Sequence, residues 1–379
     1  MLQSQDEINT AYSVLAAKES LLPIKVSTFY AQKVEDEVLS LGHRNGPLHR
    51  IVYPSSERLD AGDLNEVADF VDDRSNMPQG LQDIAVRKYK NRLLVFLTTK
   101  CFAHCQYCFR QDVLSELHAS PRSTYVSEQQ LAGISDYLRQ HPEIDEVILS
   151  GGDPMIVPAS FLGVALDALT GTGTIRNIRI HTRAAAYLPH VFDDDKIKLL
   201  ATHNVRLVSH ICHPYEICET VAETFHRLRR ANVRLYNQFP LIRGVNDHVD
   251  VLKRLLNDLD NLGIRNLSMF VPDPIKYSAS FRIRYERICA IVDALNHSTS
   301  SWINSTRVVL DTSCGKVRRE DIVAWDKDKD IIHFQRDGKM IVYHDFPAVL
   351  DRPSDIDILL WRTAKEHAIE RIGGAYAGS

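Results

Sequence analysis

The sequence lacks an excess of positive charge. Its 45 lysines and arginines are outnumbered by 49 aspartates and glutamates, which gives a formal net charge of −4. Proteins that bind nucleic acids or anionic membranes through long-range electrostatics need a basic field. The composition therefore predicts neither partner, and we interpret the short basic run at 227–234 as a solvated helix end.

Long apolar runs are also absent. No apolar stretch reaches the roughly 18 residues that a membrane span needs. The N-terminal sequence "MLQSQDEINTAYSV" contains acids and no apolar core of a secretory signal. Seven cysteines are an odd number, which argues against a disulfide framework. These features predict a protein of the reducing cytoplasm.

After residue 90 the sequence contains a regular alternation of predicted strands and predicted helices. Residues 1–85 are predicted to form a mostly helical region. Beyond them, apolar β-branched runs alternate with amphipathic stretches, and after a longer first interval the pitch is about thirty residues, the size of one βαβ unit. The predicted strands are 93–97, 146–150, 177–181, 205–210, 233–239 and 266–271. Such alternation predicts an α/β fold with a parallel sheet, either open or curved into a barrel.

Polar residues favour the curved sheet. They follow the C-terminal end of nearly every predicted strand, and they include three cysteines, "SGGDP" at 150–154, His181, Arg183, His210, Gln238 and Asp273. In α/β barrels the reacting groups lie on this face, whereas an open sheet favours a single crevice. We therefore expect a full or partial barrel.

The three cysteines are Cys101, Cys105 and Cys108, spaced C-x3-C-x2-C. A structural zinc site would normally need four Cys or His ligands, and His104 is so close to Cys105 in sequence that it would struggle to reach the same ion. Three thiolates in one loop suit a [4Fe–4S] cluster with one iron left open, because such clusters normally have four cysteine ligands. An open iron could bind a substrate or cosubstrate.

This motif, with Tyr107 before its last cysteine, resembles that of the radical S-adenosylmethionine (SAM) enzymes. "SGGDP" looks like their glycine-rich SAM-binding motif, which implies SAM contacts for Gly151, Gly152 and Asp153. The resemblance implies a partial (β/α)6 barrel and a cluster that cleaves SAM reductively to a 5′-deoxyadenosyl radical. It also implies a flavodoxin- or ferredoxin-type reductant.

Four blocks are similar to lysine 2,3-aminomutase and its relatives, which use SAM together with pyridoxal 5′-phosphate (PLP). They are "YKNRLLVFLTTKC" (89–101), "SGGDPMIVP" (150–158), "SHICHPYEI" (209–217) and "RLYNQFPLIRGVNDHVDVL" (234–252). PLP needs a lysine for its Schiff base and cationic groups for its phosphate. The resemblance implies Lys316 for the Schiff base, Tyr89 and Arg92 for the phosphate, and His210 and Gln238 near the SAM ribose.

The family also implies a substrate site and an activity. Arg110 falls on an arginine that meets the substrate carboxylate, and Asp273 and Asp311 stand where two aspartates hold a side-chain ammonium. The implied activity is that of an isomerase, a 2,3-aminomutase that converts lysine or another basic L-α-amino acid to its β-amino acid. The predicted organisation is a helical region at 1–85, the radical SAM partial barrel at 86–285, and a C-terminal region at 286–379 that carries the PLP lysine.

Departures from the family leave further hypotheses open. The segment "LDTSCGKVRRE" around Lys316 has one glycine where the family has several, and Lys88 replaces an arginine. The stretch "IKYSASFRIRYE" could place Lys276 or Arg282 in the pocket, which would favour an acidic substrate. The C-terminal zinc cysteines of the family are missing, so we expect no structural zinc, although a homo-oligomer is still expected. Two more hypotheses are a PLP-independent radical SAM enzyme and a metal-binding scaffold without catalysis.

Overall fold

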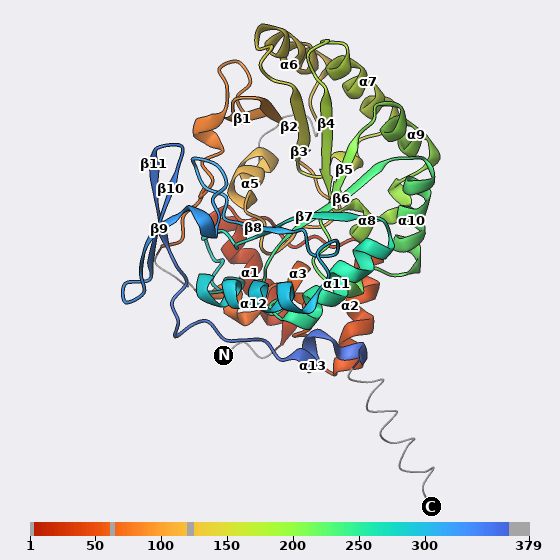
Figure 1. Cartoon of the computed structure of the whole chain (residues 1–379). Coiled ribbons are helices and arrows are strands. Elements are labelled where there is room, and N and C mark those ends of the chain that lie inside the picture. Colours follow the sequence, from red (N-terminus) through yellow and green to blue (C-terminus); the bar gives the residue numbers. More distant parts are fainter. Residues whose placement is uncertain (1–3, 61–64, 120–124, 364–379) are drawn as a thin grey trace, which may run out of the picture.

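A central sheet of eight strands organises the computed structural model, which describes residues 4–60, 65–119 and 125–363 (Figure 1). The strands lie in chain order. They are β1 (Ala85–Tyr89), β2 (Arg92–Thr98), β3 (Glu146–Gly151), β4 (Asn177–Thr182), β5 (Arg206–Ser209), β6 (Arg234–Pro240), β7 (Arg265–Phe270) and β8 (Arg307–Val309). Strands β2 to β8 pair in parallel, and β1 pairs antiparallel with β2. Among the described residues the sheet is not closed into a barrel, which confirms the predicted α/β fold with a partial barrel.

Helices cover the outer face of the sheet and one end of the molecule (Figure 1). They are α1 (Gln5–Glu19), α2 (Thr28–Leu41), α3 (Pro47–Val52), α4 (Ser56–Leu59), α5 (Gln111–Ala119), α6 (Glu128–Gln140), α7 (Ala159–Thr170), α8 (Ala184–Tyr187), α9 (Asp194–Thr202), α10 (Glu219–Arg230), α11 (Val249–Asn261), α12 (Tyr285–Ser298) and α13 (Ile356–Leu359). The apolar residues of α11 recur at helical spacing and are buried, as in Val251, Leu255 and Leu259. None of the helices in the described ranges is long and apolar enough to cross a membrane.

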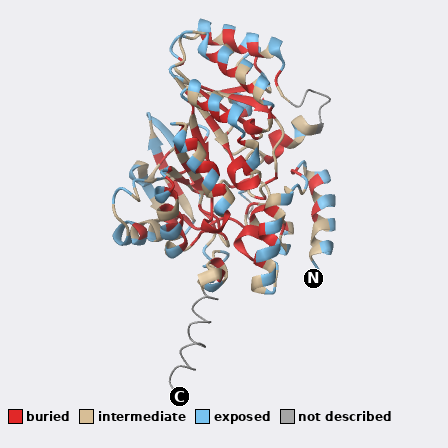
Figure 2. Ribbon diagram, turned by 90° about the vertical axis from the view of Figure 1, so that its right-hand side faces the viewer, coloured by how far each residue is buried: buried red, intermediate tan, exposed pale blue. Residues whose placement is uncertain are grey.

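Each central strand has two different faces, as period-two alternation requires. In β4, Ile178 and Ile180 are buried in the core, whereas Arg179 and His181 line a cavity on the inner face. Figure 2 shows buried residues concentrated in the sheet and on the inner sides of the helices. The apolar outer face of the sheet therefore packs against the helices, and the inner face carries the polar side chains that line the cavity.

Several strands were not predicted. Strands β1 and β8 extend the sheet on both sides, and a separate antiparallel sheet of order β11-β10-β9 lies in the C-terminal part. Its strands are β9 (Ile322–Asp326), β10 (Ile331–Arg336) and β11 (Lys339–His344). The division of the chain at residues 85 and 285 stays a prediction.

Candidate active site

A cavity of about 280 Å³ extends along the inner face of the sheet. One end lies at the starts of β2 and β4, and the other is formed by the loops that follow the strands. Every residue that the sequence predicted for the site lines this cavity. They are Tyr89, Arg92, Cys101, Cys105, Cys108, Arg110, Gly151, Gly152, Asp153, His210, Gln238, Asp273, Asp311 and Lys316.

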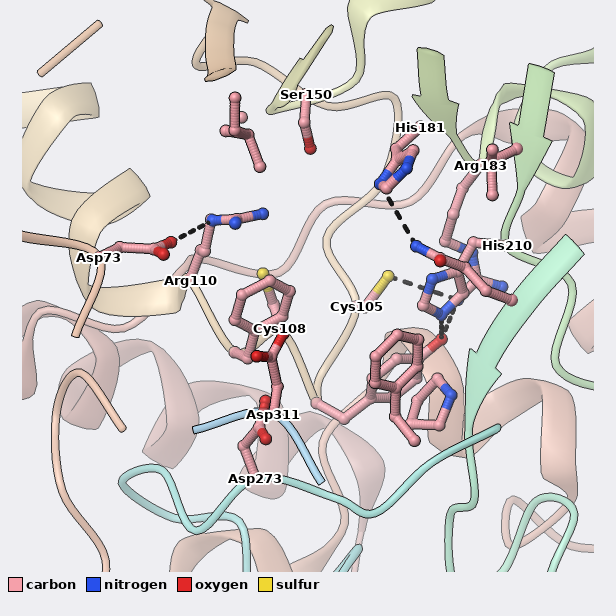
Figure 3. A pocket seen from close by; sticks show the side chains of 18 of the residues that line it. Asp73, Cys105, Cys108, Arg110, Ser150, His181, Arg183, His210, Asp273 and Asp311 are labelled. Atoms are coloured by element: carbon pink, nitrogen blue, oxygen red, sulfur yellow. Dashed lines mark hydrogen bonds and ion pairs between the residues drawn. The ribbon is translucent and has the colours of Figure 1, made fainter. Parts of the chain in front are cut away.

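The cysteine loop follows β2, and its three thiols are free. Figure 3 shows two of them, Cys105 and Cys108. Burial, followed by the neighbouring Cys105, raises the pKa of Cys108 to about 12, and burial also raises the pKa of Cys101 well above its usual range. Such thiols become thiolates when a metal binds them. His104 Nδ1 donates to the Pro23 carbonyl oxygen at 2.7 Å, and the residue does not line the cavity, so it gives no support to a fourth zinc ligand.

The three thiols suit a cluster better than a single ion. In the described part of the chain, no group of three or more His, Cys, Asp or Glu side chains converges tightly enough to hold one metal ion. A [4Fe–4S] cluster instead takes each thiolate at a different iron, so its ligands lie further apart. Three thiols from one loop on one cavity wall match that donor set.

The glycines of "SGGDP" let β3 approach the cysteine loop. Gly151 has a φ of +94°, and a β-carbon at Gly152 would lie 2.2 Å from the Lys100 carbonyl oxygen. The Gly152 N–H donates to the Thr98 carbonyl at 2.7 Å, and the Asp153 N–H donates to the Lys100 carbonyl at 2.7 Å. The motif therefore fixes the backbone directly before Cys101.

Asp153 lines the cavity, but its carboxylate accepts hydrogen bonds from other residues of the protein. One oxygen accepts from the Thr182 hydroxyl at 2.6 Å and from the Met155 N–H at 3.1 Å, and the other accepts from the Arg183 N–H at 2.9 Å. These bonds tie the ends of β3 and β4 together. A SAM contact of Asp153 stays a prediction, and its side chain has a structural role as well.

Two predicted SAM residues belong to a layer of aromatic and amide side chains. The His210 ring stacks on Tyr107 at 5.9 Å between centroids, with Nε2 3.3 Å from the tyrosine oxygen. Gln238 Nε2 lies 3.3 Å from His181 Nδ1 (Figure 3). Burial lowers the pKa of His181 and of His210 well below the usual range, so both imidazoles are neutral at pH 7.

A tight turn presents Lys316 to the cavity. Leu310 and Val317 exchange two backbone hydrogen bonds of 2.9 Å, and the turn between them contains Gly315 with a φ of +101°. A β-carbon at Gly315 would lie 3.2 Å from the Tyr89 ring, and the Tyr89 hydroxyl accepts from the Lys316 N–H at 3.2 Å. The single glycine of this segment therefore occupies the position that has a positive φ and lies against the Tyr89 ring, where a side chain would be strained.

The Lys316 amine lies deep in the cavity, 4.8 Å from the centroid of the Phe270 ring. Burial lowers its pKa, Asp311 opposes that change, and Arg179 and Arg92 add to it. No hydrogen-bond or ion-pair partner for this amine is found among the described residues. A lysine of this kind is a better nucleophile at neutral pH than a solvated one.

Two guanidinium groups share one carboxylate at the strand-start end of the cavity. Glu146 lies 3.5 Å from Arg92 Nε and 2.9 Å from Arg179 Nε, and Arg92 stacks 4.6 Å above the Tyr89 ring. The local charge is positive and suits a phosphate. Arg179 was not predicted, although a charged residue between Ile178 and Ile180 on an apolar strand was a usable signal.

The predicted substrate residues differ in their pairing (Figure 3). Arg110 Nε is 2.6 Å from a carboxylate oxygen of Asp73, a residue that no sequence pattern had singled out. Asp311 lies 3.6 Å from Lys88 Nζ. The Asp273 carboxylate has no hydrogen-bond or ion-pair partner in the described ranges, and burial, followed by Asp311, raises its pKa well above the usual range.

The basic side chains that would favour an acidic substrate lie elsewhere. Lys276 Nζ is 3.5 Å from Glu19, and Arg282 Nη2 donates to the His344 carbonyl at 3.0 Å. Neither side chain lines the cavity.

Comparison with known proteins gives one family model and several relatives. A model described as a 4Fe-4S single cluster domain matches residues 91–207. The L-lysine 2,3-aminomutase of Buchnera aphidicola is 26% identical over 80% of this chain and 87% of its own. Those of Haemophilus influenzae and Escherichia coli are 33% and 30% identical, each over 58% of this chain and 63% of the relative. These last two alignments span less than two thirds of the relatives.

Proposed function

Because the chain belongs to the radical SAM family of lysine 2,3-aminomutases, we propose that it is an amino acid 2,3-aminomutase. It would bind a [4Fe–4S] cluster, SAM and PLP, and move the amino group of a basic L-α-amino acid from C2 to C3. The observation that carries the proposal is that every predicted site residue lines one cavity. These residues come from strands and loops that are far apart in the sequence.

When bound, the cluster and SAM supply a radical that removes a substrate hydrogen, and PLP supplies the carrier for the migrating amine. Cys101, Cys105 and Cys108 would hold the cluster. Lys316 would hold PLP, because its lowered pKa leaves more of the amine unprotonated at neutral pH. Arg92 would bind the phosphate, since it is a cation that lines the same cavity and acts electrostatically on Lys316.

The arginines of the cavity would orient the anionic groups. Arg179 stands beside Arg92 on Glu146, so a phosphate there could accept from both guanidinium groups. Arg110 keeps one edge of its guanidinium on Asp73 through Nε, which fixes the group in place. Its terminal nitrogens would then receive the substrate carboxylate.

The side-chain specificity of the enzyme would depend on Asp273. A carboxylate that faces the cavity without a partner among the described residues favours a cationic ligand, because partial burial without one penalises the charge. Asp311 is already neutralised in part by Lys88. A basic amino acid such as lysine is therefore the proposed substrate class, and an acidic one would meet like charge at Asp273.

The proposal is tested by anaerobic incubation of the reconstituted protein with SAM, dithionite, PLP and a panel of amino acids. A β-amino acid from lysine, arginine or ornithine is expected, and none from glutamate, aspartate or alanine. Turnover of glutamate or aspartate alone would overturn the basic substrate but not the aminomutase. A desalted protein without a visible PLP chromophore, and without one after PLP is added, would favour a PLP-independent radical SAM enzyme.

A further inference from the structure

Arg183 carries a buried charge directly beside a cluster cysteine. The residue follows β4, its side chain is 8% exposed, and its Nη1 donates to Cys105 Sγ at 3.4 Å and to the Tyr107 hydroxyl. Its Nη2 pairs with the fully buried Glu216. The guanidinium thus connects the cysteine loop to the segment after β5.

The partner carboxylate is held rigidly. Glu216 Oε1 accepts from the Tyr30 hydroxyl at 3.0 Å, and Oε2 accepts from the backbone N–H groups of Cys212 at 2.7 Å and His213 at 3.2 Å. With its oxygens bonded in this way, Glu216 holds Arg183 in one position. A buried ion pair is often no more stabilising than apolar side chains of the same volume. Fold stability therefore does not explain why the Arg183–Glu216 pair lies beside the Cys105 sulfur.

A second donor reaches the same sulfur. The Tyr187 hydroxyl lies 3.0 Å from Cys105 Sγ, and the Arg183 guanidinium lies 4.5 Å above the Tyr187 ring. An iron-bound thiolate has no proton to give, so the tyrosine must donate in the cluster-bound protein. Two neighbouring side chains therefore direct N–H and O–H groups at one cluster ligand.

We propose that Arg183 and Tyr187 set the reduction potential of the cluster by donating to its Cys105 ligand, with Glu216 as the residue that positions Arg183. This inference rests on the proposed cluster. Hydrogen bonds to the sulfurs and nearby positive charge favour the reduced cluster, which carries one more negative charge. The step is the transfer of one electron from a low-potential one-electron donor to the oxidised cluster, and no bond of the protein forms or breaks.

The test is a redox titration of the reconstituted protein, followed by electron paramagnetic resonance of the reduced cluster. Tyr187→Phe removes one donor and keeps the ring. It should lower the ratio of reduced to oxidised cluster at a fixed potential about tenfold, which corresponds to a reduction potential about 59 mV lower for one electron. Arg183→Gln should lower it further, and Arg183→Lys should restore part of the loss. Tyr343→Phe is the matched control, because it removes a buried hydroxyl that accepts from an arginine, Arg282, at 3.3 Å and that has no contact with Arg183, Glu216 or a cluster cysteine among the described residues.

Iron and sulfide content are measured first in every protein. Wild-type protein that cannot hold a cluster would overturn the proposed function together with this inference. If Tyr187→Phe and Arg183→Gln both have full iron content and the wild-type reduction potential, this inference alone is overturned. An equal shift in Tyr343→Phe would also contradict it, because the effect would then not depend on contact with the sulfur.

Discussion

Asp273→Asn removes the charge of the cavity carboxylate that has no partner among the described residues. The side chain keeps its shape, so the change isolates the charge. A substrate ammonium at Asp273 would make a charge-assisted contact, typically worth about 1.5–3 kcal/mol. Its loss should lower kcat/KM for lysine roughly ten- to a hundredfold and leave SAM cleavage itself intact.

The same substitution should stabilise the substrate-free protein at neutral pH. Burial, with Asp311 nearby, raises the Asp273 pKa well above its ordinary value. The unfolded chain loses this proton near pH 4, whereas the folded protein keeps it to higher pH, so wild-type stability falls as the pH rises from about 4 through the raised pKa. Asparagine does not titrate, and the variant should melt at a higher temperature at pH 7 than the wild type, with the difference vanishing toward pH 4.

Melting curves at several pH values and kcat/KM for lysine and alanine test both effects. Asp311→Asn is the control, because it leaves Lys88 without its 3.6 Å partner; it should weaken lysine binding without the gain in stability. If Asp273→Asn keeps the wild-type preference for lysine and the wild-type melting profile, the role assigned to this carboxylate is refuted.

Three further predictions concern the cluster, PLP and the glycine motif. Alanine at any of Cys101, Cys105 or Cys108 should abolish iron binding and 5′-deoxyadenosine formation, whereas Cys218→Ala and Cys289→Ala should keep both. Lys316→Ala should fold and bind iron but lose the PLP that borohydride fixes to the protein; peptide mapping that finds the label on another lysine would contradict this. Gly152→Ala would place a β-carbon 2.2 Å from the Lys100 carbonyl oxygen, so it should cost about 1–3 kcal/mol of unfolding free energy and lower the iron content. Gly133→Ala, with open space around its β-carbon, should do neither.

The main strands were predictable because their signal is local. The run at 146–150 and the observed β3 (Glu146–Gly151) differ by one residue, since a buried parallel strand needs a continuous apolar run. Strand β8 has three residues and depends on pairing with β7, which is distant in the sequence. Such a strand leaves no local pattern.

The placement of the site was predictable for a topological reason. The carboxyl ends of parallel strands meet at one rim, so residues that follow them come together whatever their separation in the chain. The partners were not predictable. The contacts of Asp73 with Arg110, of Lys88 with Asp311 and of Tyr187 with Cys105 join segments that no periodicity relates.

The most direct test of the proposed aminomutase follows the nitrogen itself. Lysine labelled with 15N at the α-amino group and with 13C at C2 and C3 is incubated with the reconstituted protein, SAM, PLP and dithionite, and the product is examined by NMR. The proposal predicts a 15N–13C coupling that moves from C2 to C3 in the wild type and stays at C2 in Lys316→Ala. A wild-type protein that cleaves SAM but leaves the label on C2 of every basic amino acid tested would contradict it.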